Sequence, residues 1–391
     1  MKTIKRVPEQ PPGTQQPPGT QQPPGTEAPT RAELLDGEGR GRLTRGNKAV
    51  LAAFFFFLVV IVAGSVVHLP YAVMSPGPTQ DTLGTSADGK NTPIISVSGL
   101  PTYPTDGALR FTTVRVEGGP GFPVDAFDVL QAWVDPARDV FPVDDIFDPQ
   151  VTKEQVAEEN AIQMEGSQEE ATAVALRAIG KEVPTHIAVA GLTDSSKAKD
   201  LLKVGDRITA IGSDSITSTQ AVRDALQKSR PGDTVSLTVT RSGKQEKLDV
   251  PTIAGQGGRT ALGVLLGLDH DFPATVKIDA GAIGGPSAGL MFSLGIYDKL
   301  TPGPLAGGRQ IAGTGTIDDE GKVGPIGGIH QKLAGARADG AQFFLAPADN
   351  CDEVVGHVPD GLDVFKVGTF DDARTAVESV AKGQTGSLPR C

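Results

Sequence analysis

Two glycine-rich stretches carry side chains that could act as a nucleophile and its base. The first, IGGPSAGL at residues 283–290, places Ser287 at the expected start of a helix, with Pro286 in its first turn. Unpaired N–H groups and the positive dipole end at a helix start stabilise a developing negative charge. Because Pro286 has no N–H, we expect the backbone N–H groups of Ser287 and of either Gly285 or Gly284 to hold an oxyanion.

The second stretch, GPIGGIHQKL at residues 324–333, places Lys332 in the first turns of an expected helix that continues to about Ala338. A positive charge is unfavourable near a helix start, which helps to lower the pKa of the amine. A neutral amine can take the proton of a serine hydroxyl, as a general base must. A lone lysine is usually a solvated surface cation, so Lys332 gains its significance from the combination with Ser287.

Together, the two stretches resemble the proteolytic domain of Lon-type peptidases. The GPSAG motif of that family falls on residues 285–289 and implies that Ser287 is the nucleophile. The PIGG-x-x-x-K motif implies that Lys332 is the base. A Thr-Gly pair of the family falls on Thr314, 18 residues before the lysine, and implies that this threonine orients the amine. The resemblance covers about residues 257–380.

The sequence departs from the Lon pattern at two positions, one directly before the Gly-Pro-Ser stretch and one directly before the lysine. Many Lon peptidases have an acidic residue where this chain has Gly284, and often a glutamate where it has Gln331. A nearby anion stabilises an ammonium group, so the loss of both carboxylates favours the neutral base and is compatible with activity. We expect no catalytic role for His330, which lies on a different side of the helix from Lys332.

Composition argues against several other functions. The chain has 391 residues and a net charge of −11, which is unfavourable for binding nucleic acid. Five scattered histidines and two cysteines, Cys351 and Cys391, make metal catalysis a poor hypothesis, and we expect no cofactor. The sequence has no GxxxxGK[ST] loop, so we expect ATP-independent cleavage of flexible or already unfolded segments.

A second resemblance precedes the Lon-like stretch. Residues 219–228 are expected to form a helix, and residues 235–241 and 245–250 a hairpin. With the segments LKVGDRITAIGSDSI and VSLTVTRSGK, they resemble a PDZ domain of the bacterial type, which we place at residues 181–254. Such a domain implies capture or gating of a peptide that pairs with a sheet edge, its C-terminal carboxylate held in a backbone nest. The alternative is a domain that only supports its neighbour. Two positions for the carboxylate loop stay open: Gly191 and Leu192, or Leu262 and Gly263.

The N-terminal part contains a polar repeat and an apolar segment. The QPPGTQ repeat is expected to be disordered, or alternatively to serve as a polyproline ligand for an SH3-like partner. The uncharged stretch from Ala49 to Val67 is long enough to cross a membrane. Basic residues precede it and none follows before Lys90, which predicts a cytoplasmic N-terminus and an extracytoplasmic remainder. A cleaved signal peptide is the disfavoured alternative, because both the leader and the apolar run are too long.

The expected fold class is multidomain: a single transmembrane helix, a β-rich stem, a PDZ-like β-sandwich domain and an α+β Lon-type proteolytic domain. The predicted boundaries are 1–48 for the cytoplasmic tail, 49–68 for the transmembrane helix, 69–180 for the stem with its helix, 181–254 for the PDZ-like domain, 256–381 for the Lon-type domain and 382–391 for a flexible C-terminus. This order resembles the membrane-anchored PDZ–Lon-type peptidases of Gram-positive bacteria.

The sequence thus predicts a membrane-tethered serine endopeptidase that acts on extracytoplasmic polypeptides with flexible segments or exposed C-termini. A catalytically idle scaffold or chaperone is the alternative, because two family carboxylates are missing. Cleavage of its own stem between residues 70 and 89 is a third possibility. The resemblance also implies a possible homo-oligomer, since Lon-type domains often form rings, although the sequence identifies no interface.

Overall fold

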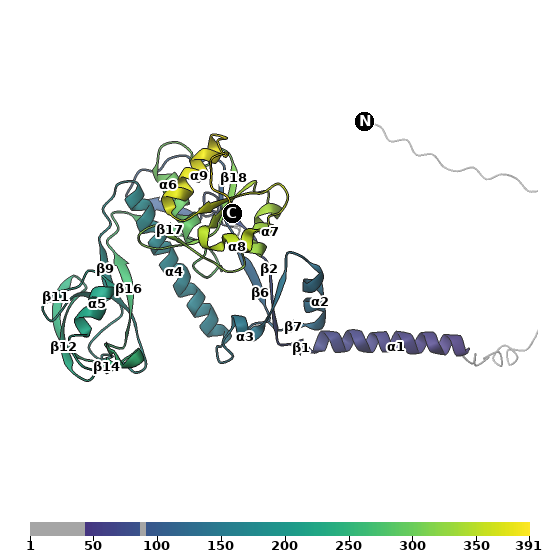
Figure 1. Cartoon of the computed structure of the whole chain (residues 1–391), viewed down its shortest axis with the longest axis horizontal. Helices are drawn as coiled ribbons and strands as arrows, with labels where there is room; N and C mark the ends of the chain where they lie inside the picture. The colour runs from purple at the N-terminus through teal and green to yellow at the C-terminus, as the bar shows by residue number, and fades with distance from the viewer. Residues whose placement is uncertain (1–43, 87–90) are drawn as a thin grey trace, which may run out of the picture. The chain divides into compact units, whose positions relative to one another are not determined.

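The computed structural model describes residues 44–86 and 91–391, so most of the predicted tail lies outside the described residues. The chain divides into two compact units, Met1–Val62 and Ala63–Cys391. The apolar stretch forms one helix, α1 (Arg45–Val66), drawn in purple in Figure 1. It has 22 residues, none of them buried, and is the one helix among the described residues that is long and apolar enough to cross a membrane.

A five-stranded sheet organises the Lon-like part of the second unit. Its strand order is β22 (Asp363–Val367), β21 (Phe343–Pro347), β18 (Gln310–Gly313), β5 (Ala108–Phe111) and β3 (Gln80–Asp81). The first four strands run parallel, and β3 is antiparallel to β5. This nearly parallel arrangement is a finer description than the expected α+β class.

Helices cover both faces of this sheet. Side chains alternate along each strand, so Ile311 and Leu345 pack into one apolar core while Ala312 and Phe344 pack into another. The first core contains α6 (Gly289–Leu300) and α9 (Phe370–Ala381), and the second contains α7 (Ile329–Ala338) and α8 (Cys351–Val354), all labelled in Figure 1. Parallel strands usually need one buried layer on each face of their sheet, and the two cores provide these layers.

The segment predicted as a separate stem supplies central parts of this domain. Strand β5 pairs with β18, and its Phe111 ring lies 5.1 Å from the ring of Phe292 on α6. Strand β4 (Ile95–Ser98) pairs with β17 (Thr275–Ile278), and α4 (Lys153–Ala178) packs against α6. The PDZ-like unit is therefore an insertion between α4 and β17. The predicted boundary at residue 180 followed the order of the chain. The strand pairs show instead that segments before and after the PDZ-like insertion belong to one domain.

A smaller β-rich layer comes directly after α1. It contains β1 (His68–Leu69) paired with β7 (Val124–Asp125), and the sheet β6 (Val114–Glu117), β2 (Tyr71–Pro76), β8 (Asp139–Pro142), with the helices α2 (Ala126–Val134) and α3 (Val143–Ile146). Residues 109–116, which mix apolar and polar side chains, are divided between β5 and β6. The two strands belong to different sheets.

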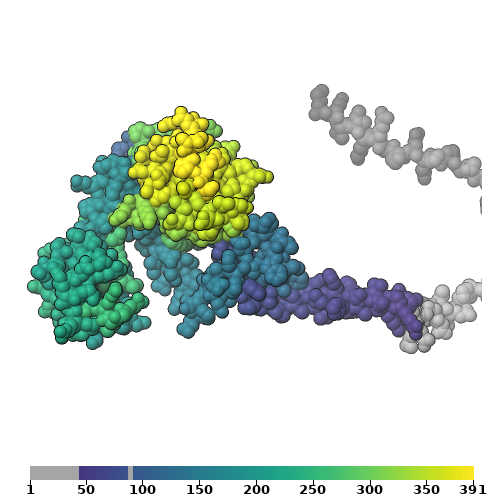
Figure 2. Space-filling model, in the orientation of Figure 1, coloured from purple at the N-terminus to yellow at the C-terminus, as the bar shows by residue number. Residues whose placement is uncertain are grey.

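The PDZ-like unit forms a compact body of its own, shown in teal and green in Figure 2. Its sheet has the order β13 (Lys244–Pro251), β12 (Thr234–Arg241), β10 (Arg207–Ile211), β9 (Thr185–Leu192) and β16 (Val264–His270), with β11 (Asp214–Ser215) beside β10. Smaller elements are α5 (Thr219–Leu226), β14 (Ile253–Ala254), the 3-10 helix η1 (Gln256–Gly258) and β15 (Thr260–Ala261). The predicted helix and hairpin are confirmed, but the sheet extends beyond residue 254 because β16 pairs along β9.

The C-terminal segment 382–391 is fixed, whereas we expected it to be flexible. Cys391 forms a disulfide with Cys351, next to the 3-10 helix η2 (Ala348–Asn350), with 4.9 Å between the two Cα atoms. The Arg390 guanidinium lies 5.2 Å from the centre of the Phe365 ring and also bonds to Asp363 at 2.7 Å. Sequence reasoning left the state of both cysteines open.

Candidate active site

Ser287 lies in the loop that leads into α6, two residues before the helix begins at Gly289. The helix thus starts later than the sequence suggested, and Pro286 belongs to the loop rather than to the first turn. Gly285 has a φ of +85°, a conformation that favours glycine. Ser287 is partly exposed, unlike the fully buried residues 288–290 that follow it.

The Thr-Gly pair holds the backbone of Ser287, the candidate nucleophile. The Gly315 N–H donates to the Ser287 carbonyl at 2.9 Å, and the Thr314 hydroxyl donates to the same oxygen at 3.1 Å. The Leu290 N–H donates in turn to the Gly315 carbonyl at 3.1 Å. Two chain segments are therefore fixed to each other on both sides of the catalytic candidate.

Lys332 lies in the first turns of α7, as expected, but its amine points into the protein. Gly328, at the cap of this helix, has a φ of +69°. The residue is only 2% exposed, and its Nζ donates to Thr314 Oγ1 at 3.1 Å. The Thr314 hydroxyl thus accepts from Lys332 and donates to the Ser287 carbonyl.

Burial lowers the pKa of Lys332 to about 7. Desolvation is the cause, since removal from water disfavours the charged ammonium. The neighbouring Gln331 brings no charge and donates to Asp139 at 2.7 Å. A large part of the amine is therefore neutral near pH 7, as a general base requires. The helix start, which the sequence suggested as a contributor, is not needed to explain the shift.

The predicted oxyanion donors differ in their availability. The Gly285 N–H donates to the Asn160 carbonyl of α4 at 2.9 Å. Within residues 44–86 and 91–391, the N–H groups of Gly284 and Ser287 donate to no other group. Of the two alternatives for the second donor, Gly284 is thus the one with a free N–H.

Sequence reasoning missed the contribution of α4. The Ser167 hydroxyl is buried and donates to the Pro286 carbonyl at 3.0 Å. A Cβ on Gly284 would come within 2.6 Å of the Asn160 Cβ, so glycine permits the close approach of helix and loop. These two α4 residues lie more than a hundred residues before the loop, and no local motif marks them.

The proposed dyad is not joined directly. Among the described residues, no hydrogen bond links Ser287 Oγ to Lys332 Nζ. Catalytic hydrogen bonds often tighten only when substrate is bound. His330 bonds instead to the Glu353 carbonyl at 2.9 Å and stacks on His357 with 3.5 Å between ring centres. These contacts give His330 a structural role.

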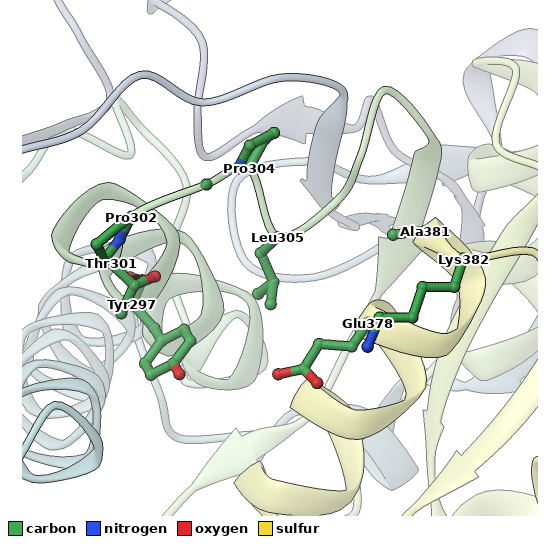
Figure 3. Close-up of a pocket in the computed structure, with 9 residues that line it drawn as sticks. Tyr297, Thr301, Pro302, Pro304, Leu305, Glu378, Ala381 and Lys382 are labelled. Carbon is green, nitrogen blue, oxygen red and sulfur yellow. Dashed lines mark hydrogen bonds between the residues drawn. The ribbon is translucent and has the colours of Figure 1, made fainter.

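Cavities in the Lon-like part include two that are lined by neither Ser287 nor Lys332. A cavity of about 310 Å³ opens between the end of α6 and α9, where Tyr297, Leu305 and Glu378 point towards it (Figure 3). A second cavity of about 280 Å³ includes Glu170 and the short strands β19 (Thr316–Ile317) and β20 (Val323–Gly324). Burial first, and then nearby carboxylates, raises the pKa of Glu170 to about 7.

The two candidate positions for the PDZ carboxylate loop lie side by side. Leu192 is paired with Val264, and the Thr193 N–H donates to the Gly263 carbonyl at 2.9 Å. Strand β9, which contains Gly191, lies between β10 and β16, whereas β16 is at the end of the sheet. Within the part of the chain that the structure describes, β16 therefore has an unpaired edge and β9 does not.

Comparison with known proteins identifies both parts. Residues 269–377 match the Lon protease (S16) C-terminal proteolytic domain, and residues 169–252 match the PDZ domain. Lon protease 1 of Sorangium cellulosum is 37% identical over 103 residues, covering 25% of this chain and 12% of that protein. Lon protease 2 of Bacillus subtilis is 32% identical over 102 residues, covering 26% of this chain and 17% of that protein.

Among solved structures, the PDZ domain of an SdrC-like protein from Listeria monocytogenes is 28% identical, with a TM-score of 0.20, covering 21% of this chain and 86% of that domain. The chain spans less than a fifth of the length of the two Lon proteases. It thus carries a Lon-type proteolytic domain and a PDZ domain, a combination that supports a serine peptidase.

Proposed function

We propose that this protein is an ATP-independent serine endopeptidase in which Ser287 is the nucleophile and Lys332 the general base. The observation that carries the proposal is the buried Lys332 amine, whose pKa is about 7 and which Thr314 connects to the Ser287 backbone. A buried lysine without an ion partner is unfavourable for stability, and such groups concentrate at functional sites. The match to a Lon-type domain supports the same assignment.

In the proposed reaction, Lys332 Nζ takes the proton of Ser287 Oγ while this oxygen attacks the peptide carbonyl carbon. The N–H groups of Ser287 and Gly284 hold the negative oxygen of the tetrahedral intermediate. The ammonium then gives its proton to the leaving amine as the C–N bond breaks. Water, deprotonated by the neutral lysine, hydrolyses the acyl-enzyme and restores the serine.

We further propose that α1 anchors the protein in a membrane and that residues after it face the extracytoplasmic side. The length and apolar composition of α1 support the anchor. The disulfide between Cys351 and Cys391 supports an oxidising compartment, because such bonds are rare in the cytosol. A ring-like homo-oligomer stays a prediction.

The PDZ-like unit is proposed to capture flexible polypeptides with exposed C-termini. Strand addition needs an edge strand, and β16 supplies one. Residues Leu262 and Gly263 lead directly into β16, so we assign the carboxylate loop to them rather than to Gly191 and Leu192. If a peptide with a free C-terminus binds no better than its C-terminal amide, this assignment is wrong.

The activity is tested by incubating the full chain with unfolded casein and identifying fragments by mass spectrometry. Wild type should cleave, while Ser287→Ala and Lys332→Ala should not, although both fold. His330→Ala is the matched control and should keep its activity. Absence of cleavage by folded wild type would favour the idle scaffold, for which the two missing family carboxylates are the argument.

A further inference from the structure

Helix α2 (Ala126–Val134) exposes an apolar face. The exposed fractions of its large apolar side chains are 42% for Phe127, 54% for Leu130, 69% for Trp133 and 76% for Val134. The other side of the helix is buried, since Val129 and Ala132 are each 2% exposed and pack in a small core with Val73. The exposed face is therefore additional to the face that holds the helix in the fold.

The exposed face carries little charge. The helix contains no lysine or arginine, and its one acid, Asp128, is used at the helix start, where its carboxylate accepts from the Asp125 N–H at 2.9 Å. The Asp125 side chain accepts in return from the N–H groups of Phe127 and Asp128. This capping box fixes the helix at its beginning. Large apolar groups gathered on one exposed helix face mark a surface that needs a partner.

Strand pairing places α2 close to the end of the apolar helix α1. Strand β1 begins two residues after α1 ends, and it pairs His68 with Asp125 and Leu69 with Val124. Helix α2 starts at Ala126, directly after Asp125 of β7. The Phe127 ring also lies against Gly64 in the last turns of α1, where a Cβ would come within 2.7 Å of it. The apolar face thus begins where the apolar helix ends.

We propose that α2 lies in the interfacial region of the bilayer that α1 crosses, with Phe127, Leu130 and Trp133 among the lipid headgroups and upper acyl chains. This inference rests on the membrane anchor proposed above. Tryptophan and phenylalanine favour this region, because it accommodates large apolar rings beside water. Continuity with α1 favours a lipid surface over a protein partner. Contact of α2 with the bilayer, in addition to the crossing by α1, would restrain rotation of the attached domain about the axis of α1.

Trp133 is the only tryptophan of the chain, so its fluorescence reports on this face alone. The full chain is reconstituted in phosphatidylcholine–phosphatidylglycerol vesicles, with and without bromine on the acyl chains. Brominated lipid should reduce Trp133 emission about twofold or more, since bromine on the acyl chains quenches only a tryptophan that comes close to it within the bilayer. Aqueous iodide should have little effect.

The matched control moves the tryptophan to another exposed apolar position. The double variant Trp133→Phe, Val204→Trp places it in the PDZ-like unit, where Val204 is 66% exposed. Its emission should be quenched by iodide and unaffected by bromine. Adding Leu130→Ser and Val134→Ser to the wild-type chain should weaken the quenching of Trp133 by brominated lipid.

Flotation of the vesicles separates the two proposals. Protein that floats, with Trp133 quenched by iodide but not by bromine, would retain the anchor and overturn the inference. Protein that floats with Trp133 shielded from both quenchers would also overturn it and point to a protein contact instead. Protein that does not float would overturn both proposals.

Discussion

The two sides of the candidate active site are built differently. On one side, Lys332 is almost completely buried and its amine donates to Thr314. On the other side, Ser287 is partly exposed, and one neighbouring N–H group, that of Gly285, is occupied by a carbonyl of α4. The side with the proposed base is therefore complete within the core, whereas the proposed oxyanion side depends on a helix from a distant part of the chain.

This difference shows that separate parts of one fold can bury the lysine amine and position the loop that contains the serine. The core around α7 lowers the pKa of Lys332 by excluding water, and this needs no charged partner. The loop before α6 has no comparable enclosure and is held by Thr314 and Ser167. Variants on the two sides should consequently differ in their effects on activity and stability.

The largest effect is expected for Lys332→Met. Cleavage should fall at least about 10³-fold, because the proposed general base is lost. Stability should rise, by up to roughly 4 kcal/mol at pH 7, because a buried amine with a lowered pKa is replaced by an apolar chain of similar length. Ser287→Ala is the control, with the same loss of activity and little change in chemical denaturation.

The sign of the pH dependence follows from the lowered pKa. Between about pH 7 and the ordinary lysine pKa of 10.5, the unfolded chain binds more protons at Lys332 than the folded chain does. Wild-type stability should therefore gain from this group as pH rises through that window, and Lys332→Met should lack that gain. An equal pH slope in both proteins would contradict the buried-amine model.

A smaller loss is expected when the link between the two sides is removed. Thr314→Val deletes the hydroxyl that accepts from Lys332 and donates to the Ser287 carbonyl. Loss of these buried hydrogen bonds should lower kcat roughly 10- to 100-fold, with little change in KM. Thr314→Ser keeps the hydroxyl and should restore most of the activity; failure to do so would assign the effect to packing.

The pH profile of cleavage tests the base side alone. Because the neutral amine is the active form and its pKa is about 7, kcat/KM should rise about tenfold between pH 6 and pH 8 and then level off. The profile is measured with a peptide substrate that has no titrating group in this range. His330→Ala should leave the midpoint unchanged, and a shifted midpoint would identify the histidine as the titrating group.

The smallest effect is expected at the contact of α4 with the nucleophile loop. Ser167→Ala removes the hydrogen bond to the Pro286 carbonyl and should lower kcat about fivefold, in line with the loss of about 1 kcal/mol. Thr172→Val is the matched control, since its buried hydroxyl bonds only within α4, to the Gln168 carbonyl. It should affect stability and leave kcat unchanged. Equal effects on kcat would mean that Ser167 acts through helix stability.

Local patterns predicted much of the fold. The sequence located α7, whose predicted end at about Ala338 is confirmed, and the helix and hairpin of the PDZ-like unit. It did not predict that β5 joins the sheet of β18 or that the PDZ-like unit is inserted between α4 and β17. Pairing between strands some two hundred residues apart leaves no periodic signal in either strand, so chain order alone could not reveal it.

The sequence by itself determined which side chains are chemically notable, because Ser287, Thr314 and Lys332 occur in short motifs with fixed spacing. Only the tertiary structure decided that the lysine amine is buried and that Asn160 occupies the N–H of Gly285. The physical reason is that a pKa depends on the solvent excluded by every packed neighbour, and a hydrogen bond depends on distance in space. Neither quantity is encoded in the residues adjacent to the motif.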